Sequence, residues 1–170
     1  MASHCNPVFY DGLFYCLSKD GKLGIFNPEE EYEDVWKILV RAIFPLQNME
    51  YHLTSLRSFL VEYCGEFFSF FVPVNKPIDV FKLDRSEMKW VRVESLGDKV
   101  AFLSHTTSVL VPAGLKGVEN RIYLPKFYGI DNMYYSLTTR SFSYFGSKDP
   151  CAKWIDSSEI FDCTWFQANL

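Results

Sequence analysis

Two pairs of adjacent residues have side chains that could do chemistry. Ser104 and His105 are neighbours, as are His4 and Cys5. Adjacent residues in a strand point to opposite faces, so the first pair predicts a turn or strand end and not a nucleophile with its base. The second pair lies near the terminus without a Cys-x-x-Cys or His-x3-His spacing, so we predict no metal site. No catalytic residue is assigned to either pair.

A run of carboxylates is the third chemical candidate. Residues 29–34 hold five acidic side chains around Tyr32. An acid and a base need differently buried surroundings to separate their pKa values, and a solvated run does not provide them. We expect a surface turn here, with contact to a basic partner as the functional alternative. The chain also lacks a Gly-x-Ser-x-Gly elbow and a phosphate-binding loop, so no cofactor is predicted.

Composition narrows the class of protein further. The 170 residues are 48% hydrophobic and 22% charged, with a net charge of -4, which argues for a folded domain and against nucleic-acid binding. The longest near-apolar run, 67–74, is too short to span a membrane. The start of the chain does not resemble a secretory signal. An odd, scattered set of cysteines favours reduced thiols, so we expect a cytoplasmic or nuclear protein: Cys5, Cys16, Cys64, Cys151 and Cys163.

The elements that would position any site come from an internal repeat of about 54 residues. Glycines, phenylalanines and tryptophans recur at nearly this offset, and a weaker third copy follows in register. The landmarks are Gly12, Phe26 and Trp36 in the first copy, Gly65, Phe81 and Trp90 in the second, and Asn120, Leu137 and Tyr144 in the third. We interpret these recurring positions as structural.

Each repeat has the pattern of consecutive hairpins. The Asp11-Gly12 and Cys64-Gly65 pairs separate apolar runs, which is typical of two-residue hairpin turns. The second copy predicts four strands, over 58–63, 66–74, 78–83 and 89–96. Four antiparallel strands in about 50 residues predict a kelch-type blade.

The predicted fold class is therefore all-β, a partial kelch-like β-propeller with about three blades of four antiparallel strands. A single domain would span 1–170, with units near 8–57, 58–119 and 120–150 and a C-terminal tail over 151–170. One segment is ambiguous, because 29–44 also has the cap, the proline and the apolar spacing of an amphipathic helix. We predict a strand carrying Trp36 there, and the helix stays open.

Several motifs resemble one plant family. They are Phe14-Tyr-Cys-Leu17, 21–28, Val80-Phe-Lys-Leu-Asp84, 88–98, Phe102-Leu-Ser104, 108–112 and 120–125. Together they are similar to the plant F-box/kelch-like proteins whose C-terminal domain, long labelled as of unknown function, is viewed as a β-propeller. The resemblance covers nearly the whole chain. It implies a propeller that selects proteins for ubiquitination, while an N-terminal F-box docks onto a Skp1–cullin ligase. No helical, Leu/Pro-patterned segment precedes the first hairpin, so we expect no ligase-docking part.

The predicted function is a non-enzymatic protein-interaction module whose protein partner is unknown. The alternative is a propeller-scaffold enzyme with acid and base residues on its loops. The loop 127–132 does not recur in the other copies, so we predict partner contacts there, at Tyr128, Ile130, Asp131 and Asn132. Three blades would leave open edges, and self-association through them is expected. The sequence alone does not decide between a complete gene product and a fragment.

Overall fold

In a computed structural model, the structure describes residues 7–30, 36–40, 56–73, 76–104, 106–127 and 130–144, with only the backbone for 125–127 and 130–132. These residues form strands and no helix. The strands are β1 (Val8–Tyr10), β2 (Leu13–Leu17), β3 (Leu23–Phe26), β4 (Trp36–Val40), β5 (Arg57–Tyr63), β6 (Glu66–Val72), β7 (Asp79–Asp84), β8 (Lys89–Val93), β9 (Lys99–Phe102), β10 (Val109–Pro112), β11 (Arg121–Phe127), β12 (Ile130–Ser136) and β13 (Ser141–Tyr144).

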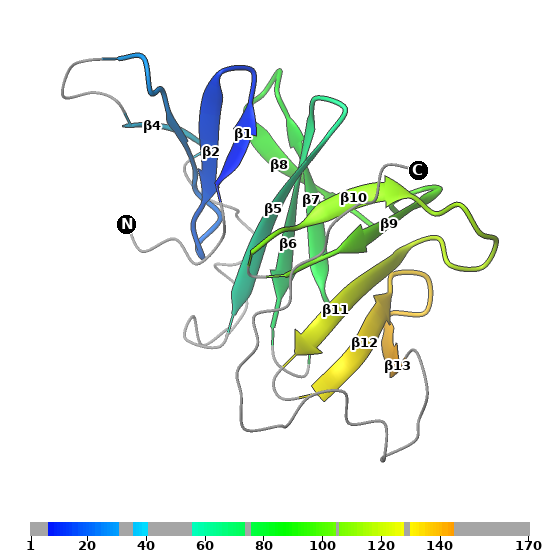
Figure 1. Ribbon diagram of the computed structural model, residues 1–170. Coiled ribbons are helices and arrows are strands. Elements are labelled where there is room, and N and C mark those ends of the chain that lie inside the picture. The colour runs from blue at the N-terminus through cyan, green and yellow to red at the C-terminus, as the bar shows by residue number, and fades with distance from the viewer. Residues whose placement is uncertain are drawn as a thin grey trace.

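The strands form three sheets, which confirms the predicted all-β class (Figure 1). Sheet 1 has the order β1-β2-β3-β4 and sheet 2 the order β5-β6-β7-β8, each with antiparallel neighbours throughout. Sheet 3 differs from the predicted blade. It has five strands in the order β10-β9-β11-β12-β13, and β9 runs parallel to β11.

The parallel pair moves a predicted boundary. The second repeat unit was expected to run to residue 119 and the third to begin at Asn120. The strand pairing ends sheet 2 at Val93 and places Lys99–Pro112 in sheet 3. Because this pairing joins segments that are not successive hairpin arms, the offset between repeated residues does not reveal it.

Hairpin turns start the first two sheets as the sequence predicts. Asp11 and Gly12 have φ of 51° and 77°, and Cys64 and Gly65 have φ of 52° and 80°. Positive φ at both central residues matches the right-handed twist of the flanking strands. Asn120 also has a positive φ, of 61°, directly before β11, but no hairpin joins β10 to β11, since β9 lies between them in sheet 3.

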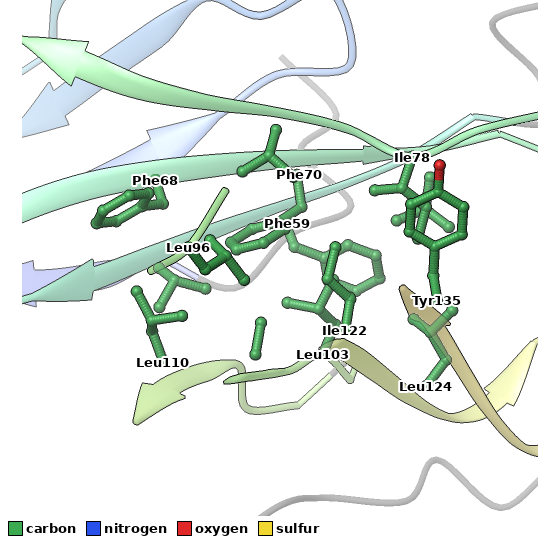
Figure 2. Packing of buried hydrophobic residues seen from close by; sticks show 14 residues of the cluster. Phe59, Phe68, Phe70, Ile78, Leu96, Leu103, Leu110, Ile122, Leu124 and Tyr135 are labelled. Atoms are coloured by element: carbon green, nitrogen blue, oxygen red, sulfur yellow. The ribbon is translucent and has the colours of Figure 1, made fainter. Parts of the chain in front are cut away.

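Sheet 2 lies between the other two sheets (Figure 1), and β6 has buried side chains on both faces of sheet 2. Phe67 and Phe71 pack with the inner residues of sheet 1. Phe68 and Phe70 point the other way and pack with sheet 3 (Figure 2). The period of two along a strand thus places alternate side chains in two separate cores, which explains why β6 is almost entirely apolar.

The sheet register confirms one pair of landmarks. Trp36 is paired with Phe26, and Trp90 is paired with Leu83. Counted from Gly12 and Gly65, both tryptophans occupy the same position on their fourth strands. The hairpin between the second and third strands is longer in sheet 2 than in sheet 1, and the connection to the fourth strand is shorter. The two differences nearly cancel, so the spacing of the two tryptophans matches the repeat.

Two other landmark matches are wrong in register. The position of Phe26 in sheet 2 is occupied by Leu83, and Phe81 instead corresponds to Gly24. In sheet 3 the tryptophan position is occupied by Phe142 and not by Tyr144, because Phe142 is the residue paired with Tyr135. Chain offset counts residues through turns of unequal length, whereas register follows the paired strands.

The ambiguous segment 29–44 is resolved in part. Residues 36–40 form the strand β4 on the edge of sheet 1, as predicted. Residues 31–35 and 41–44 lie outside the described residues. The pairing of β3 with β4 shifts register between Leu23 and Gly24, so β4 departs from simple alternation: Trp36 and Ile38 are exposed, whereas Val40 is buried.

Candidate protein-interaction site

Most of the residues first considered for catalysis fall outside the part of the chain that the structure describes. His4, His52 and His105 lie outside the described residues, as do Cys5 and most of the acidic run. Within the described ranges, no group of three or more His, Cys, Asp or Glu side chains could hold a metal ion. The same part of the chain contains no helix long and apolar enough to cross a membrane.

Ser104 takes part in a set of local hydrogen bonds in the loop between β9 and β10. Its buried hydroxyl donates to the carbonyl oxygen of Thr107 at 2.6 Å and accepts from the backbone N–H of Thr107 at 3.0 Å. The Ser108 hydroxyl donates to the Ser104 carbonyl at 3.2 Å and accepts from the Ser104 N–H at 3.3 Å. These local bonds hold the loop between β9 and β10 in one shape.

The predicted partner loop is shorter than expected. Backbone pairing joins Phe127 to Ile130 and Lys126 to Asp131, so Ile130, Asp131 and Asn132 belong to strand β12. Tyr128 lies outside the described residues, and nothing is described of the three β12 side chains. Partner contact at this hairpin stays a prediction.

A cavity forms where the first strands of the sheets approach one another. β5 contacts both β1 and β10. The cavity of about 280 Å³ takes its lining from the start of sheet 1, from β5 of sheet 2 and from the loop between β9 and β10: Pro7, Val8, Phe59, Leu60, Glu62, Ser104, Thr106, Thr107 and Ser108. We call this the axial cavity, and it lies between β1, β5 and the β9–β10 loop.

The axial cavity combines apolar walls with a polar rim. Phe59 and Leu60 are buried, whereas Thr106 is exposed. The Glu62 carboxylate accepts a hydrogen bond of 2.6 Å from the backbone N–H of Gly65, which fixes its direction. Such an arrangement suits a side chain of another protein that presents an apolar body and a polar tip.

A second cavity, of about 340 Å³, lies along the seam between sheets 2 and 3. Arg92 donates to the buried carboxylate of Asp79 at 2.6 Å. Asn120 accepts from the N–H of Leu96 at 2.6 Å through its side chain. Burial raises the pKa of the Tyr135 hydroxyl, and the positive charge of Arg140 opposes that rise. The Arg92–Asp79 pair stabilises sheet 2, and the Asn120–Leu96 bond joins the segment after β8 to the start of β11, so these contacts serve the fold.

The outer face of sheet 1 exposes aromatic rings. Phe9 is 60% exposed and Trp36 is 56% exposed. Ring centroids lie 4.9 Å apart from Phe9 to Phe14, 6.1 Å from Phe14 to Phe26, and 5.2 Å from Phe26 to Trp36. We call these four residues the outer aromatic face.

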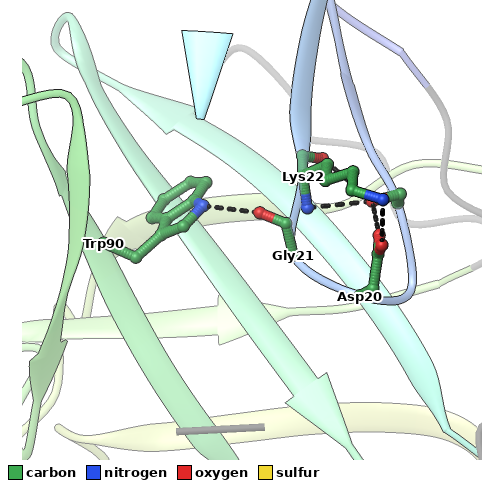
Figure 3. A network of polar contacts seen from close by, with 5 residues as sticks. Asp20, Gly21, Lys22 and Trp90 are labelled. Carbon is green, nitrogen blue, oxygen red and sulfur yellow. Dashed lines mark hydrogen bonds and ion pairs between the residues drawn. The ribbon is translucent and has the colours of Figure 1, made fainter. Parts of the chain in front are cut away.

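The corresponding face of sheet 2 is covered. Trp90, at the position of Trp36, is only 9% exposed, and its indole Nε1 donates to the carbonyl of Gly21 at 3.0 Å (Figure 3). Gly21 lies in the turn between β2 and β3, where Lys22 and Asp20 form an ion pair. Sheet 1 therefore covers the tryptophan side of sheet 2, and each sheet leans on its neighbour as propeller blades do.

Comparison with known proteins agrees with this arrangement of repeated sheets. The sequence model of the KIB1-4 beta-propeller family matches residues 4–149. The chain belongs to the KIB1-4 beta-propeller family. The resemblance to plant F-box/kelch-like proteins drawn from the sequence motifs is thereby confirmed.

Three Arabidopsis thaliana relatives are similar to this propeller chain. F-box protein At3g56470 is 28% identical over 86% of this chain and 37% of its own length. F-box/kelch-repeat protein At1g57790 is 28% identical over 72% and 34%. F-box/kelch-repeat protein At3g18720 is 30% identical over 68% and 30%. The chain thus spans about a third of the length of these relatives.

Sequence reasoning missed both the axial cavity and the outer aromatic face. The cavity depends on loop residues of ordinary type that only the stacking of three sheets brings together. The signal for the outer aromatic face was present, since Trp36 recurs as Trp90. Recurrence reveals the shared strand position, but it does not reveal that one copy lacks a covering sheet among the described residues.

Proposed function

We propose that this chain is a non-enzymatic protein-interaction module that receives a partner side chain at the axial cavity. The observation that carries the proposal is one cavity in which the apolar side chains of β1 and β5 face the hydroxyl-bearing loop between β9 and β10. Loops held by a rigid scaffold are where repeat folds place recognition. The partner is a protein that inserts one amphipathic side chain between β5 and the β9–β10 loop.

The relatives support a role in selecting proteins for ubiquitination. Their names contain F-box and F-box/kelch-repeat. The propeller of such a protein would select a substrate while another part contacts the ligase. We place this chain in the substrate-selecting part of that scheme.

An enzymatic role is the alternative, but the described lining of the axial cavity holds few groups that could take part in catalysis. Among the described lining residues, Glu62 carries the only carboxylate. Its bond to the Gly65 N–H holds it as an acceptor. Catalysis by an acid and a base together needs a second titratable group in a different environment. The described part of the cavity therefore favours binding over chemistry.

The test is a matched pair of substitutions at exposed threonines. Thr106→Arg places a bulky cation at the cavity, and Thr139→Arg places the same group in the turn between β12 and β13. Each threonine hydroxyl contacts a serine hydroxyl two residues away, at 3.5 Å for Thr106 and at 2.7 Å for Thr139. Immobilised wild-type chain and Thr139→Arg should capture the same proteins from plant extract, and Thr106→Arg should lose them. Equal capture by all three proteins would reject the cavity as the site.

The captured protein should also protect the loop from hydrogen exchange at residues 106–108.

We further propose a cytoplasmic or nuclear location, which an exposed free thiol at Cys64 supports. Imaging of the tagged chain in plant cells tests this location, and secretion of the protein would contradict it.

A further inference from the structure

We propose that the second cavity, between sheets 2 and 3, binds a small organic acid whose single carboxylate accepts hydrogen bonds from Arg140 and Tyr135. We call this space of about 340 Å³ the seam cavity. The inference goes beyond the proposed function, because the seam cavity and the axial cavity have no lining residue in common.

Four segments of the chain meet at the seam cavity. Sheet 2 contributes Ile78 and Val80 at the start of β7 and residues 92–95 at the end of β8. Sheet 3 contributes Asn120, which precedes β11, and the turn between β12 and β13. Both walls therefore come from sheets that the structure describes.

The first observation is a buried hydroxyl group at this cavity that lacks a hydrogen bond. Tyr135 lines the cavity and is only 1% exposed, and its hydroxyl makes no hydrogen bond of good geometry to the described residues. The Tyr135 side chain lies beside Ile78, a wall residue of the cavity (Figure 2). Most buried polar groups in proteins have a partner, so a ligand oxygen is the partner that we infer for this hydroxyl.

The second observation is a cation beside this hydroxyl. Burial raises the pKa of the Tyr135 hydroxyl most strongly, the positive charge of Arg140 opposes the rise, and the negative charge of Asp79 has a smaller effect. The hydroxyl is therefore protonated at neutral pH and can donate. Arg140 is exposed and makes no ion pair with the described residues. A shift of this long, exposed side chain is enough to give a ligand access to both donors.

The charges around the cavity favour a ligand with one negative charge. The lining holds two arginines, Arg92 and Arg140, against one carboxylate, the exposed Glu94. Arg92 donates to Asp79 at 2.6 Å, and an arginine has five N–H donors, so it also keeps donors for a ligand. The carboxylates of Asp79 and Glu94 would repel a doubly charged phosphate more than a carboxylate.

The remaining walls of the seam cavity are apolar. Ile78 and Val80 are buried, and Val93 and Leu137 are partly buried against the same core. A cavity of this size, with apolar walls and a few polar groups, is typical of small-molecule sites. An acid with a compact apolar body would cover these walls, whereas the short stem of an aspartate or glutamate side chain would leave them largely uncovered.

The experiment titrates the purified chain with phenylacetate and with its neutral counterpart, phenylacetamide, and follows the backbone amides by NMR. Phenylacetate should bind with a Kd of roughly 1 mM or below and shift the amide signals of residues 95 and 138–140. It should bind at least roughly 10-fold more tightly than the amide, because only the acid carries a charge for Arg140. The signals of residues 106–108, at the axial cavity, should not move.

Two substitutions test the donors. Tyr135→Phe and Arg140→Gln should each weaken phenylacetate binding by roughly 10-fold, as expected for the loss of a hydrogen bond to a charged group. Tyr134→Phe is the matched control, since Tyr134 points to the opposite face of the same strand and loses the same hydroxyl. It should bind phenylacetate like the wild type. Thermal melts show whether each variant is folded, and the comparison of acid with amide on the wild type needs no variant.

A third probe separates a free acid from an acidic side chain of a protein. A short peptide with blocked ends and one central glutamate should bind more weakly than phenylacetate, and tighter binding of the peptide would overturn the assignment to a free acid. The proposal also fails if phenylacetate does not bind, if the amide binds equally well, or if a folded Tyr135→Phe chain binds like the wild type. Thr106→Arg should bind phenylacetate normally, so loss of partner capture and loss of acid binding remain separate results.

Discussion

Trp90 and Trp36 occupy the same strand position in different surroundings, so replacing each by phenylalanine should give very different losses of stability. In Trp90→Phe the carbonyl of Gly21 loses its indole donor while it remains buried. An unsatisfied buried acceptor costs about 1–3 kcal/mol. The smaller ring also leaves part of the space between sheets 1 and 2 unfilled, which adds about 1 kcal/mol.

The expected loss for Trp90→Phe is therefore about 3 kcal/mol, or roughly 6–12 °C in Tm for a chain of this size. Trp36→Phe removes an exposed ring edge and should change stability by no more than about 0.5 kcal/mol. Thermal melts followed by far-UV circular dichroism measure both, at concentrations low enough to keep the chain monomeric. Equal losses in the two variants, or no loss in Trp90→Phe, would refute the view that sheet 1 covers one tryptophan and leaves the other open.

Three further predictions concern single residues. Gly65→Ala should lower Tm more than Gly12→Ala, because a Cβ at Gly65 would lie 2.8 Å from the Tyr10 hydroxyl, while one at Gly12 meets nothing within 4 Å. Adding Tyr10→Phe to Gly65→Ala should remove the difference in Tm between the two glycine variants. If the difference stays, the clash with the hydroxyl is not its cause. Asp84 has a pKa lowered below its usual 3.8 by the hydroxyl and backbone N–H groups of the next residues, so its stabilising effect is present at neutral pH and is lost as pH falls through the lowered pKa. Between about pH 5 and about pH 3 the Tm of the wild type should fall more than that of Asp84→Asn, and parallel falls would contradict this. Tyr135→Phe should leave Tm nearly unchanged or raise it, because the buried hydroxyl lies near Arg140 and the Ile78 backbone but makes no hydrogen bond of good geometry to the described residues. A clear drop in Tm would show that the hydroxyl is satisfied.

The sequence was sufficient for the features that depend on local chemistry. The Asp11-Gly12 and Cys64-Gly65 pairs predicted tight turns, because few residue pairs accept positive φ at both positions. The apolar run over β6 predicted a strand covered on both faces, as the two cores show. The shared position of Trp36 and Trp90 also followed from their spacing.

The features that depend on distant neighbours did not follow from the sequence. The pairing of β9 with β11 is parallel and skips a strand, so no hairpin signal marks it. The third tryptophan position holds Phe142 because that residue lies beside Tyr135, which chain offset alone misplaced by two residues. The lining of the axial cavity likewise depends on which strands lie at the inner edges of the sheets.

The sharing of β6 between two cores has a practical consequence for dividing this molecule. A cut before β5 would strip Phe67 and Phe71 of their cover, and a cut after β8 would strip Phe68 and Phe70 (Figure 2). Either truncation would expose a buried apolar face of sheet 2 to solvent, and an exposed apolar face promotes aggregation. Mapping a binding region by serial deletion would therefore report insolubility at each sheet boundary, and point substitutions on an intact chain are the safer instrument.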